Sequence, residues 1–225
     1  PYPEEKQVDA PLFNRAISGS YPPASTIKPF LGLLGLEERA IDISTIINDQ
    51  GVFQINGEGR KYRGWKEEGH GEVNLHKAIV ESSDVYFYEL ASKLTIDKIS
   101  NFLSLFNFGK NTGIDLNNES PSILPDRNWK LGNIGETWFV GDTVNMGIGQ
   151  GYIAVTPIQL ASSVSAIATK GKIFKPKLVE RLGDQDIEPE LLFSIELTKK
   201  ENWETIEKSM IAVINSWNGT AHNLY

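Results

Sequence analysis

The stretch YPPASTIKPF at residues 21–30 decides how the rest of the chain is interpreted. Two consecutive prolines suit the start of a helix, because proline fixes φ near the helical value and lacks an N–H that the first turn would leave unpaired. Residues 25–40 are then predicted to form a helix that is apolar on more than one face, which indicates burial. Ser25 and Lys28 lie three positions apart and share one face of this helix.

This pair of side chains has the composition of a nucleophilic site. A serine Oγ becomes a nucleophile when a base lies within hydrogen-bond reach, and a neutral Lys28 one turn from Ser25 can be that base. The positive end of the helix dipole also favours a nearby oxyanion. An S-x-x-K match is expected about once by chance in a chain of this length. An exposed cap beside a solvated lysine is therefore the alternative, but the buried apolar helix favours catalysis.

A second serine motif, Ser82-Ser83-Asp84, follows later in the chain. The Ser82 hydroxyl can pass a proton between a lysine and a leaving group, and Asp84 can orient it. A helix cap without chemistry, with Ser82 or Asp84 as the capping residue, is the alternative interpretation. The same S-x-[DN] form recurs at residues 216–218, but helical sequence on both sides of Ser82 favours the catalytic interpretation.

Composition argues against several classes of function. The net charge is −7, which makes a nucleic-acid partner unexpected because such binding depends on clustered Lys and Arg. The chain has no cysteine, so disulfides, cysteine zinc sites and a cysteine nucleophile are excluded. The longest apolar stretch, near residues 29–36, is far shorter than the roughly 18 residues that span a bilayer. Residues 1–5 show no signal-peptide pattern.

The remaining pattern is predominantly helical, which disfavours a doubly wound parallel sheet. Apolar spacing and capping signals predict further helices at 74–81, from about 84, at 96–106, at 156–171 and at 202–216. Short strands are predicted at 51–55 and 61–65 around an Asn56-Gly57 turn, and at 173–180. Residues 107–146 are rich in Gly, Pro and Asn and are predicted to be mostly loop.

The chain resembles penicillin-binding transpeptidases. Residues 21–30 are similar to their first motif, and residues 82–84 are similar to their second. Other stretches resemble the penicillin-binding protein 2 family, the elongation-specific class B enzymes of Gram-negative bacteria, in the expected order over nearly the whole chain. They are YRGWK (62–66), GHG (69–71), FG (108–109), TGIDL (112–116), GIGQGY (147–152), TPIQL (156–160) and NGTAH (218–222).

The resemblance implies an α+β fold of the serine β-lactamase and penicillin-binding transpeptidase type. It implies an enzyme that attacks the D-Ala-D-Ala bond of a peptidoglycan stem peptide and passes the acyl group to an amine of a neighbouring stem. β-Lactams acylate the same serine. By motif match, Ser25 is the nucleophile, Lys28 the general base and Ser82 the proton relay, and Asp84 stands where many relatives have Asn.

Two further stretches are candidates for a site. A phosphate loop follows a strand, and no strand clearly precedes Gly149, Gln150 and Gly151, so a phosphate loop is not expected. These three residues are instead predicted to shape a tight turn near the site and to contact substrate. His70 and Asp49 suggest a metal, because some relatives build a metal cluster from two Asp, a His and a Cys. Gly64 and Ser83 stand at the positions of the second Asp and the Cys. Two ligands are too few for a tight zinc site, so no metal and no cofactor are expected.

The third family motif, K-[ST]-G, is absent, and Thr169-Lys170-Gly171 only rearranges its letters. The family's strands before the serine helix also do not fit into residues 1–20. We therefore expect residues 1–225 to be an incomplete transpeptidase domain, mostly its helical part. Much of the central antiparallel sheet, the third-motif strand, the membrane anchor and the pedestal domain would be missing. The chain alone is expected to acylate poorly, because the resemblance places the second oxyanion donor past the third motif.

The resemblance also implies partners and a location. The ligands would be stem peptides and β-lactam antibiotics, and the partners would be membrane proteins of an elongation complex, including a glycosyltransferase. The protein would sit in the inner membrane with its catalytic domain in the periplasm. A division-type transpeptidase and a non-catalytic helical fragment are the alternatives. Asp84 in place of Asn and the stretch at 65–71 favour the elongation type.

Overall fold

The computed structural model describes residues 12–55, 57 and 59–224. Helices dominate the described chain. They are α1 (Arg15–Ser18), the 3-10 turn η1 (Ala24–Ile27), α2 (Lys28–Glu37), α3 (Leu75–Val80), α4 (Asp84–Lys93), α5 (Ile96–Ser104), α6 (Arg127–Ile134), α7 (Val140–Met146), α8 (Pro157–Ala168), α9 (Glu201–Asn215) and the 3-10 turn η2 (His222–Leu224).

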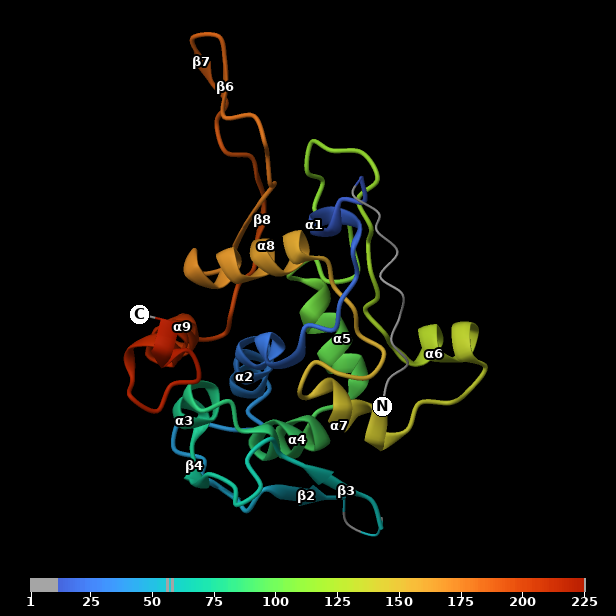
Figure 1. Cartoon of the computed structure of the whole chain (residues 1–225), viewed down its shortest axis with the longest axis vertical. Coiled ribbons are helices and arrows are strands. Elements are labelled where there is room, and N and C mark those ends of the chain that lie inside the picture. The colour runs from blue at the N-terminus through green and yellow to red at the C-terminus, as the bar shows by residue number, and fades with distance from the viewer. Residues whose placement is uncertain (1–11, 56, 58, 225) are drawn as a thin grey trace.

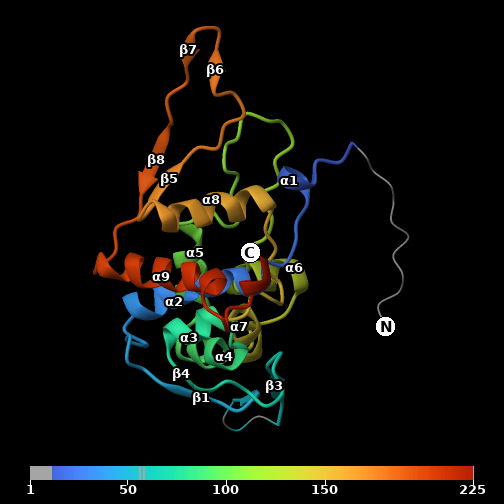
Figure 2. The same ribbon diagram turned by 60° about the vertical axis from the view of Figure 1, so that its left-hand side comes forward.

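The described strands are short and form four separate antiparallel pairs, β1–β4, β2–β3, β5–β8 and β6–β7. They are β1 (Ile47–Asp49), β2 (Val52–Gln54), β3 (Lys61–Arg63), β4 (Gly71–Val73), β5 (Lys172–Phe174), β6 (Arg181–Leu182), β7 (Gln185–Asp186) and β8 (Leu191–Ser194). Figures 1 and 2 both show the β6–β7 hairpin projecting from the helical body beyond α8.

Helix α2 lies at the centre of the helical body and packs against α3, α4, α5 and α9 (Figure 1). Phe30 and Leu33 are completely buried, and the Phe30 ring meets the rings of Phe106 and Phe108 edge to face at 5.0 and 5.3 Å between centroids. Burial of a side chain of this size contributes about 1.5–3 kcal/mol. The helix that follows Ser25 is therefore fixed from several sides.

The predicted buried helix at 25–40 is present but is shorter and begins differently. The chain enters it through η1, and regular α-helix runs only from Lys28 to Glu37. The predicted cap of the helix near residue 84 was wrong, because Ser83, and neither Ser82 nor Asp84, accepts the N–H of Tyr86. Ser82 is instead in the left-handed region, with φ of 54°, one residue before the cap.

The predicted hairpin at 51–55 and 61–65 is present as β2 and β3, with Val52 opposite Arg63; Asn56 of its predicted turn lies outside the described residues. The pairing of β1 with β4, which sets Asp49 opposite Gly71, was not predicted from the sequence. The strand predicted at 173–180 ends at Phe174, and its partner β8 was not predicted. Three-residue strands carry too little alternation to be recognised from sequence.

Residues 107–146 are mostly loop, as predicted, but they also contain the two short helices α6 and α7, which were not predicted. Asp126 caps α6 by accepting the N–H of Trp129, and Gly135 ends α6 with a φ of 81°. Asp142 reaches back to the N–H of Phe139 at the start of α7. Both helices are short and lack an apolar stripe, so their end groups rather than their periodicity mark them. No helix in the described part of the chain has the length and apolarity of a membrane span.

Candidate active site

Ser25 lies in η1, exposed at the edge of a cavity of about 610 Å³. The lining of this cavity comes from segments that are far apart in the sequence. Its residues are Ala24, Ser25, Trp65, Ser82, Asp84, Ile148, Gln150 and Thr220. Three of the four predicted catalytic residues therefore share one cavity, and the fourth, Lys28, lies buried beneath it.

Lys28 is the first residue of α2, and its side chain is only 2% exposed. Its ammonium group donates hydrogen bonds to the Ser82 carbonyl oxygen at 2.8 Å, to Ser82 Oγ at 2.9 Å and to Asp84 Oδ1 at 2.7 Å. Within the described residues the Ser25 hydroxyl has no hydrogen-bond partner. The structure thus joins Lys28 to the second motif directly and leaves the Ser25 hydroxyl free to rotate.

Asp84 is held from two sides. Its Oδ1 accepts from Lys28, and its Oδ2 accepts the backbone N–H of Trp65 at 2.9 Å. The Trp65 indole N–H also donates to the Ser82 carbonyl oxygen at 3.0 Å. Asp84 lies in the first turn of α4, where the helix dipole favours a negative charge. Trp65 and Lys28 therefore both hold the second motif through hydrogen bonds to Ser82 and Asp84.

Two opposing effects act on the pKa of Lys28. Burial is the larger and lowers the pKa, whereas the charge and hydrogen bond of Asp84, and the charge of Asp49, act to raise it. The net result is a pKa below the ordinary value of 10.5. A lowered pKa makes Lys28 easier to deprotonate and suits it to act as a general base.

Replacing Asp84 with asparagine is expected to shift the pH profile of acylation to lower pH. The change removes the carboxylate that raises the pKa of Lys28, so that pKa falls further and neutral Lys28 is present at lower pH. The second-order rate constant for acylation by a β-lactam, measured across the pH range, tests this. Asp97→Asn, at an exposed carboxylate paired with Arg127, is the control that should leave the profile unchanged. An unshifted profile in Asp84→Asn would contradict the expected coupling.

The predicted turn at Gly149–Gly151 is hydrogen-bonded to the residue before the nucleophile. The carbonyl oxygen of Gly149 accepts the backbone N–H of Ala24 at 3.0 Å, and Ala24 has an uncommon φ of 48°. The side chain of Gln150 lines the cavity, whereas Gly149 is buried and Gly151 is not among the lining residues. Of the three predicted substrate contacts, Gln150 alone lies at the cavity, and Gly149 positions the residue before Ser25.

Gly149→Ala is expected to destabilise the fold by more than about 1–2 kcal/mol and to slow acylation. Gly149 has a φ of 68°, which a residue with a side chain adopts at that cost. A Cβ there would also lie 2.2 Å from the Ala24 carbonyl oxygen, so the backbone beside Ser25 must move. Gly132→Ala in α6, where a Cβ meets nothing within 4 Å, is the control and should be neutral or slightly stabilising. Thermal unfolding and acylation rates of both variants measure this, and a Gly149→Ala protein with wild-type values would contradict it.

The residues considered as metal ligands are engaged with other groups. Ser83 Oγ donates to Asp49 Oδ2 at 2.6 Å, and Asp49 Oδ1 accepts the backbone N–H of Gly51 at 2.8 Å. His70 Nδ1 lies 2.7 Å from Glu81 Oε2. The described residues contain no group of three or more His, Cys, Asp or Glu side chains placed to hold a metal ion. The Ser83–Asp49 hydrogen bond connects β1 to the start of α4, which carries Asp84.

Ser83→Ala is expected to lower the free energy of unfolding by about 1–3 kcal/mol. The change removes the cap of α4 and leaves the buried Asp49 carboxylate without one of its hydrogen bonds. Ser92→Ala, at an exposed serine on the same helix that bonds only its own turn, is the matched control and should be near neutral. Denaturant unfolding of the two variants measures the difference. Equal stability of the two variants would contradict a structural role for Ser83.

Trp65 and Thr220 line the cavity but were not predicted as site residues. The backbone N–H of Thr220 donates to the Val80 carbonyl oxygen at 3.2 Å, and Asn218 donates to Glu81 Oε1 at 2.6 Å. These bonds hold the 218–222 segment against the end of α3. The sequence did contain a feature that could have identified them as site residues, because both lie in stretches, YRGWK and NGTAH, that resemble the family.

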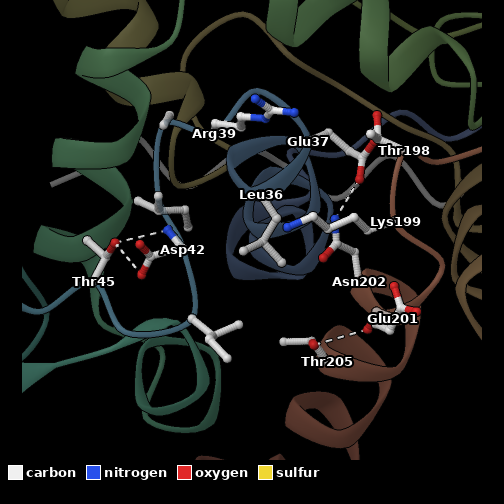
Figure 3. A pocket seen from close by; sticks show the side chains of 13 residues that line it. Leu36, Glu37, Arg39, Asp42, Thr45, Thr198, Lys199, Glu201, Asn202 and Thr205 are labelled. Carbon is white, nitrogen blue, oxygen red and sulfur yellow. Dashed lines mark hydrogen bonds between the residues drawn. The ribbon is translucent and has the colours of Figure 1, made fainter.

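A second cavity of about 670 Å³ lies elsewhere on α2, between its carboxyl end, the loop that follows and the start of α9. Figure 3 shows Glu37 at this cavity, where it accepts hydrogen bonds from Asn202 and from the backbone of Thr198. Ser25 precedes the amino end of the same ten-residue helix, about 15 Å away along its axis. The cavity in Figure 3 therefore belongs to the packing of α2 on α9 and is separate from the cavity that Ser25 lines.

The site combines an exposed serine before a buried helix, a buried lysine one turn later and a second serine bonded to that lysine. This arrangement is the one expected of a candidate serine acyl-transfer site of the serine–lysine class. The sequence matches the family described as "Penicillin binding protein transpeptidase domain" over residues 1–225. The chain belongs to this family. Its fold is that of the penicillin-binding transpeptidases, as the sequence predicted, and the described part is mostly helical with small sheets.

Individual relatives are similar over nearly all of the chain. It is 39% identical over 219 residues to the peptidoglycan D,D-transpeptidase MrdA of Haemophilus influenzae, an alignment that covers 96% of the chain and 34% of that protein. The structure of Pseudomonas aeruginosa PBP2 in complex with WCK 5153 matches with a TM-score of 0.90 and 38% identity, over 97% of the chain and 50% of that structure.

Helicobacter pylori PBP2, in its complex with MreC, matches with a TM-score of 0.86 and 36% identity, over 95% of the chain and 39% of that structure. The chain thus spans about a third of the length of the curated relatives that it matches. Both structural matches are penicillin-binding protein 2 structures, which confirms the resemblance drawn from the motifs.

Proposed function

We propose that the protein containing this chain is a peptidoglycan D,D-transpeptidase of the elongation type, which cross-links stem peptides through an acyl-enzyme on Ser25. One observation carries the proposal: Ser25, Ser82 and Asp84 line one cavity while Lys28 beneath it donates to both Ser82 and Asp84. The similarity to proteins named peptidoglycan D,D-transpeptidase MrdA and to PBP2 structures supports the same activity.

In the first step, Ser25 Oγ bonds to the carbonyl carbon of the penultimate D-Ala, and the bond from that carbon to the nitrogen of the terminal D-Ala breaks. Neutral Lys28 accepts the serine proton as this bond forms. Ser82 Oγ, 2.9 Å from Lys28 Nζ, then passes a proton to the departing amine. The backbone N–H of Ser25 is one donor to the oxyanion, by resemblance to the family.

In the second step, an amine of a neighbouring stem peptide attacks the ester carbonyl of acylated Ser25. The amine loses a proton to the lysine–serine pair, the Ser25 ester bond breaks, and Ser25 Oγ regains its proton. A new amide joins the two stems. A β-lactam enters the same first step as a cyclic amide, and its ring opening leaves Ser25 acylated.

We extend the proposal to the setting of the enzyme. Its relatives include a PBP2 whose structure was solved in complex with MreC, which supports a partner protein of that kind for this protein. A glycosyltransferase partner and a catalytic domain on the periplasmic side of the inner membrane fit an enzyme that cross-links newly made glycan strands. Neither the acidic charge nor the cavity suggests a nucleic-acid ligand.

A two-substrate reaction with the intact protein tests the proposal. A synthetic stem peptide ending in D-Ala-D-Ala and an amine-bearing acceptor peptide should yield free D-Ala and a product whose mass equals donor plus acceptor minus D-Ala. Pretreatment with a β-lactam should prevent both products. Folded protein that neither releases D-Ala nor becomes acylated would contradict the proposal and favour a non-catalytic binding role.

A further inference from the structure

Lys130 is a buried cation that the mechanism above does not use. It is the one buried residue of α6, and its side chain is 1% exposed although its neighbours Leu131 and Arg127 are exposed. Its ammonium group lies 2.7 Å from Asp142 Oδ2 and 3.5 Å from Glu136 Oε2. Burial acts to lower the pKa of Lys130, but Asp142, Tyr152 and Glu136 raise it overall, so the group is charged at neutral pH.

Aromatic rings complete the surroundings of this cation. The ammonium group lies 4.5 Å from the ring centroid of Phe139 and 5.4 Å from that of Tyr152. The Tyr152 ring in turn meets Trp129 at 5.6 Å and Trp138 at 6.2 Å between centroids. Each contact between a cation and a ring contributes attraction that depends on the position of the ring face. Lys130 therefore orients Tyr152 while it holds α6 against α7.

Tyr152 directly follows the Gly149–Gly151 turn that borders the catalytic cavity. That turn is tied to the nucleophile segment by the Ala24–Gly149 hydrogen bond and presents Gln150 to the cavity. Helix α7 comes before this turn in the chain, and its first turn contains Asp142, the other partner of Lys130. Lys130 thus contacts the chain on both sides of the turn.

From this arrangement we propose that Lys130 is a positioning residue, which holds the 147–152 segment and with it Gln150 and Ala24 in the geometry that Ser25 acylation requires. The inference rests on the proposed function and adds a role for a residue outside the cavity. An apolar side chain could fill this space without the cost of desolvating a charge. The ammonium group, in contrast, fixes the positions of two specific groups, because it pairs with a carboxylate of α7 and contacts the face of the Tyr152 ring at the same time.

The test compares variants that remove the cation or the ring with variants that keep them. Lys130→Met and Tyr152→Leu should each lower the rate constant of acylation at saturating β-lactam by about tenfold, since small displacements of reacting groups have effects of this size or larger. Tyr152→Phe keeps the ring face and should stay within about twofold of wild type. Lys170→Met, which breaks an exposed pair with Glu204, is the control for loss of a lysine charge.

Rates are counted per acylated protein at the end of the reaction, so that unfolded molecules do not enter them. Slow acylation in Lys130→Met and Tyr152→Leu, with normal rates in Tyr152→Phe and Lys170→Met, supports the positioning role. Lower melting temperatures with wild-type acylation rates would make Lys130 merely structural and overturn the inference. If Lys130→Met does not fold, the contrast between Tyr152→Leu and Tyr152→Phe decides. Wild-type protein that is not acylated would overturn the proposed function together with the inference.

Discussion

Replacing Ser25 with alanine is expected to remove acylation by β-lactams, with a fall of about 10⁴–10⁶-fold in rate, because it removes the hydroxyl on which the acyl-enzyme is proposed to form. The expected mass spectrum of the intact wild-type protein, which contains this chain, shows one adduct after β-lactam exposure, and peptide mapping places it on Ser25. The variant should remain folded, since the Ser25 side chain is exposed and has no hydrogen-bond partner among the described residues.

Thr26→Ala is the matched control for the Ser25 variant. Thr26 is the next residue of η1 and is also exposed, but its hydroxyl donates to the Pro23 carbonyl oxygen. The control should form the adduct at close to the wild-type rate. An adduct that persists in Ser25→Ala, at Ser82 or elsewhere, would show that the nucleophile has been assigned to the wrong serine.

Ser25 and Lys28 could be predicted as site residues because they lie close together in the sequence. Ser25 and Lys28 lie one turn apart in a segment whose prolines and apolar residues already indicate a buried helix. Ser82 and Asp84 were predicted from their resemblance to a second motif, and the structure places both against Lys28. The part that Trp65 plays depends on a backbone hydrogen bond to Asp84 across 19 positions, which no local pattern signals.

The fold was predictable where elements were long or strongly capped. Helix α8 begins with a capping box between Thr156 and Gln159 and was predicted at its start. Helices α6 and α7 were missed because they are short and their capping groups, rather than a periodic apolar face, mark where they begin and end. The β1–β4 pair was missed because three residues give no readable alternation. Short elements of this kind depend on contacts that the sequence does not reveal.

Lys28→Met is expected to lower the acylation rate by about 10²–10⁴-fold, the usual contribution of a positioned general base. Methionine has nearly the same length and shape, so the packing of α2 is kept while the base is removed. The variant should also lose about 3–5 kcal/mol of stability, because Asp84 would then be a buried carboxylate without its cation. These two effects have different origins, and a second substitution separates them.

The double variant Lys28→Met/Asp84→Asn removes both charges of the pair. The neutral asparagine side chain can still accept the Trp65 N–H that Asp84 Oδ2 accepts in the wild type, so most of the lost stability should return. Acylation should stay as slow as in Lys28→Met, since no base has been restored. Recovery of acylation together with stability would mean that Lys28 serves only to neutralise Asp84, and that another group removes the proton from Ser25. Slow acylation in a protein of restored stability would assign the proton transfer to Lys28 itself.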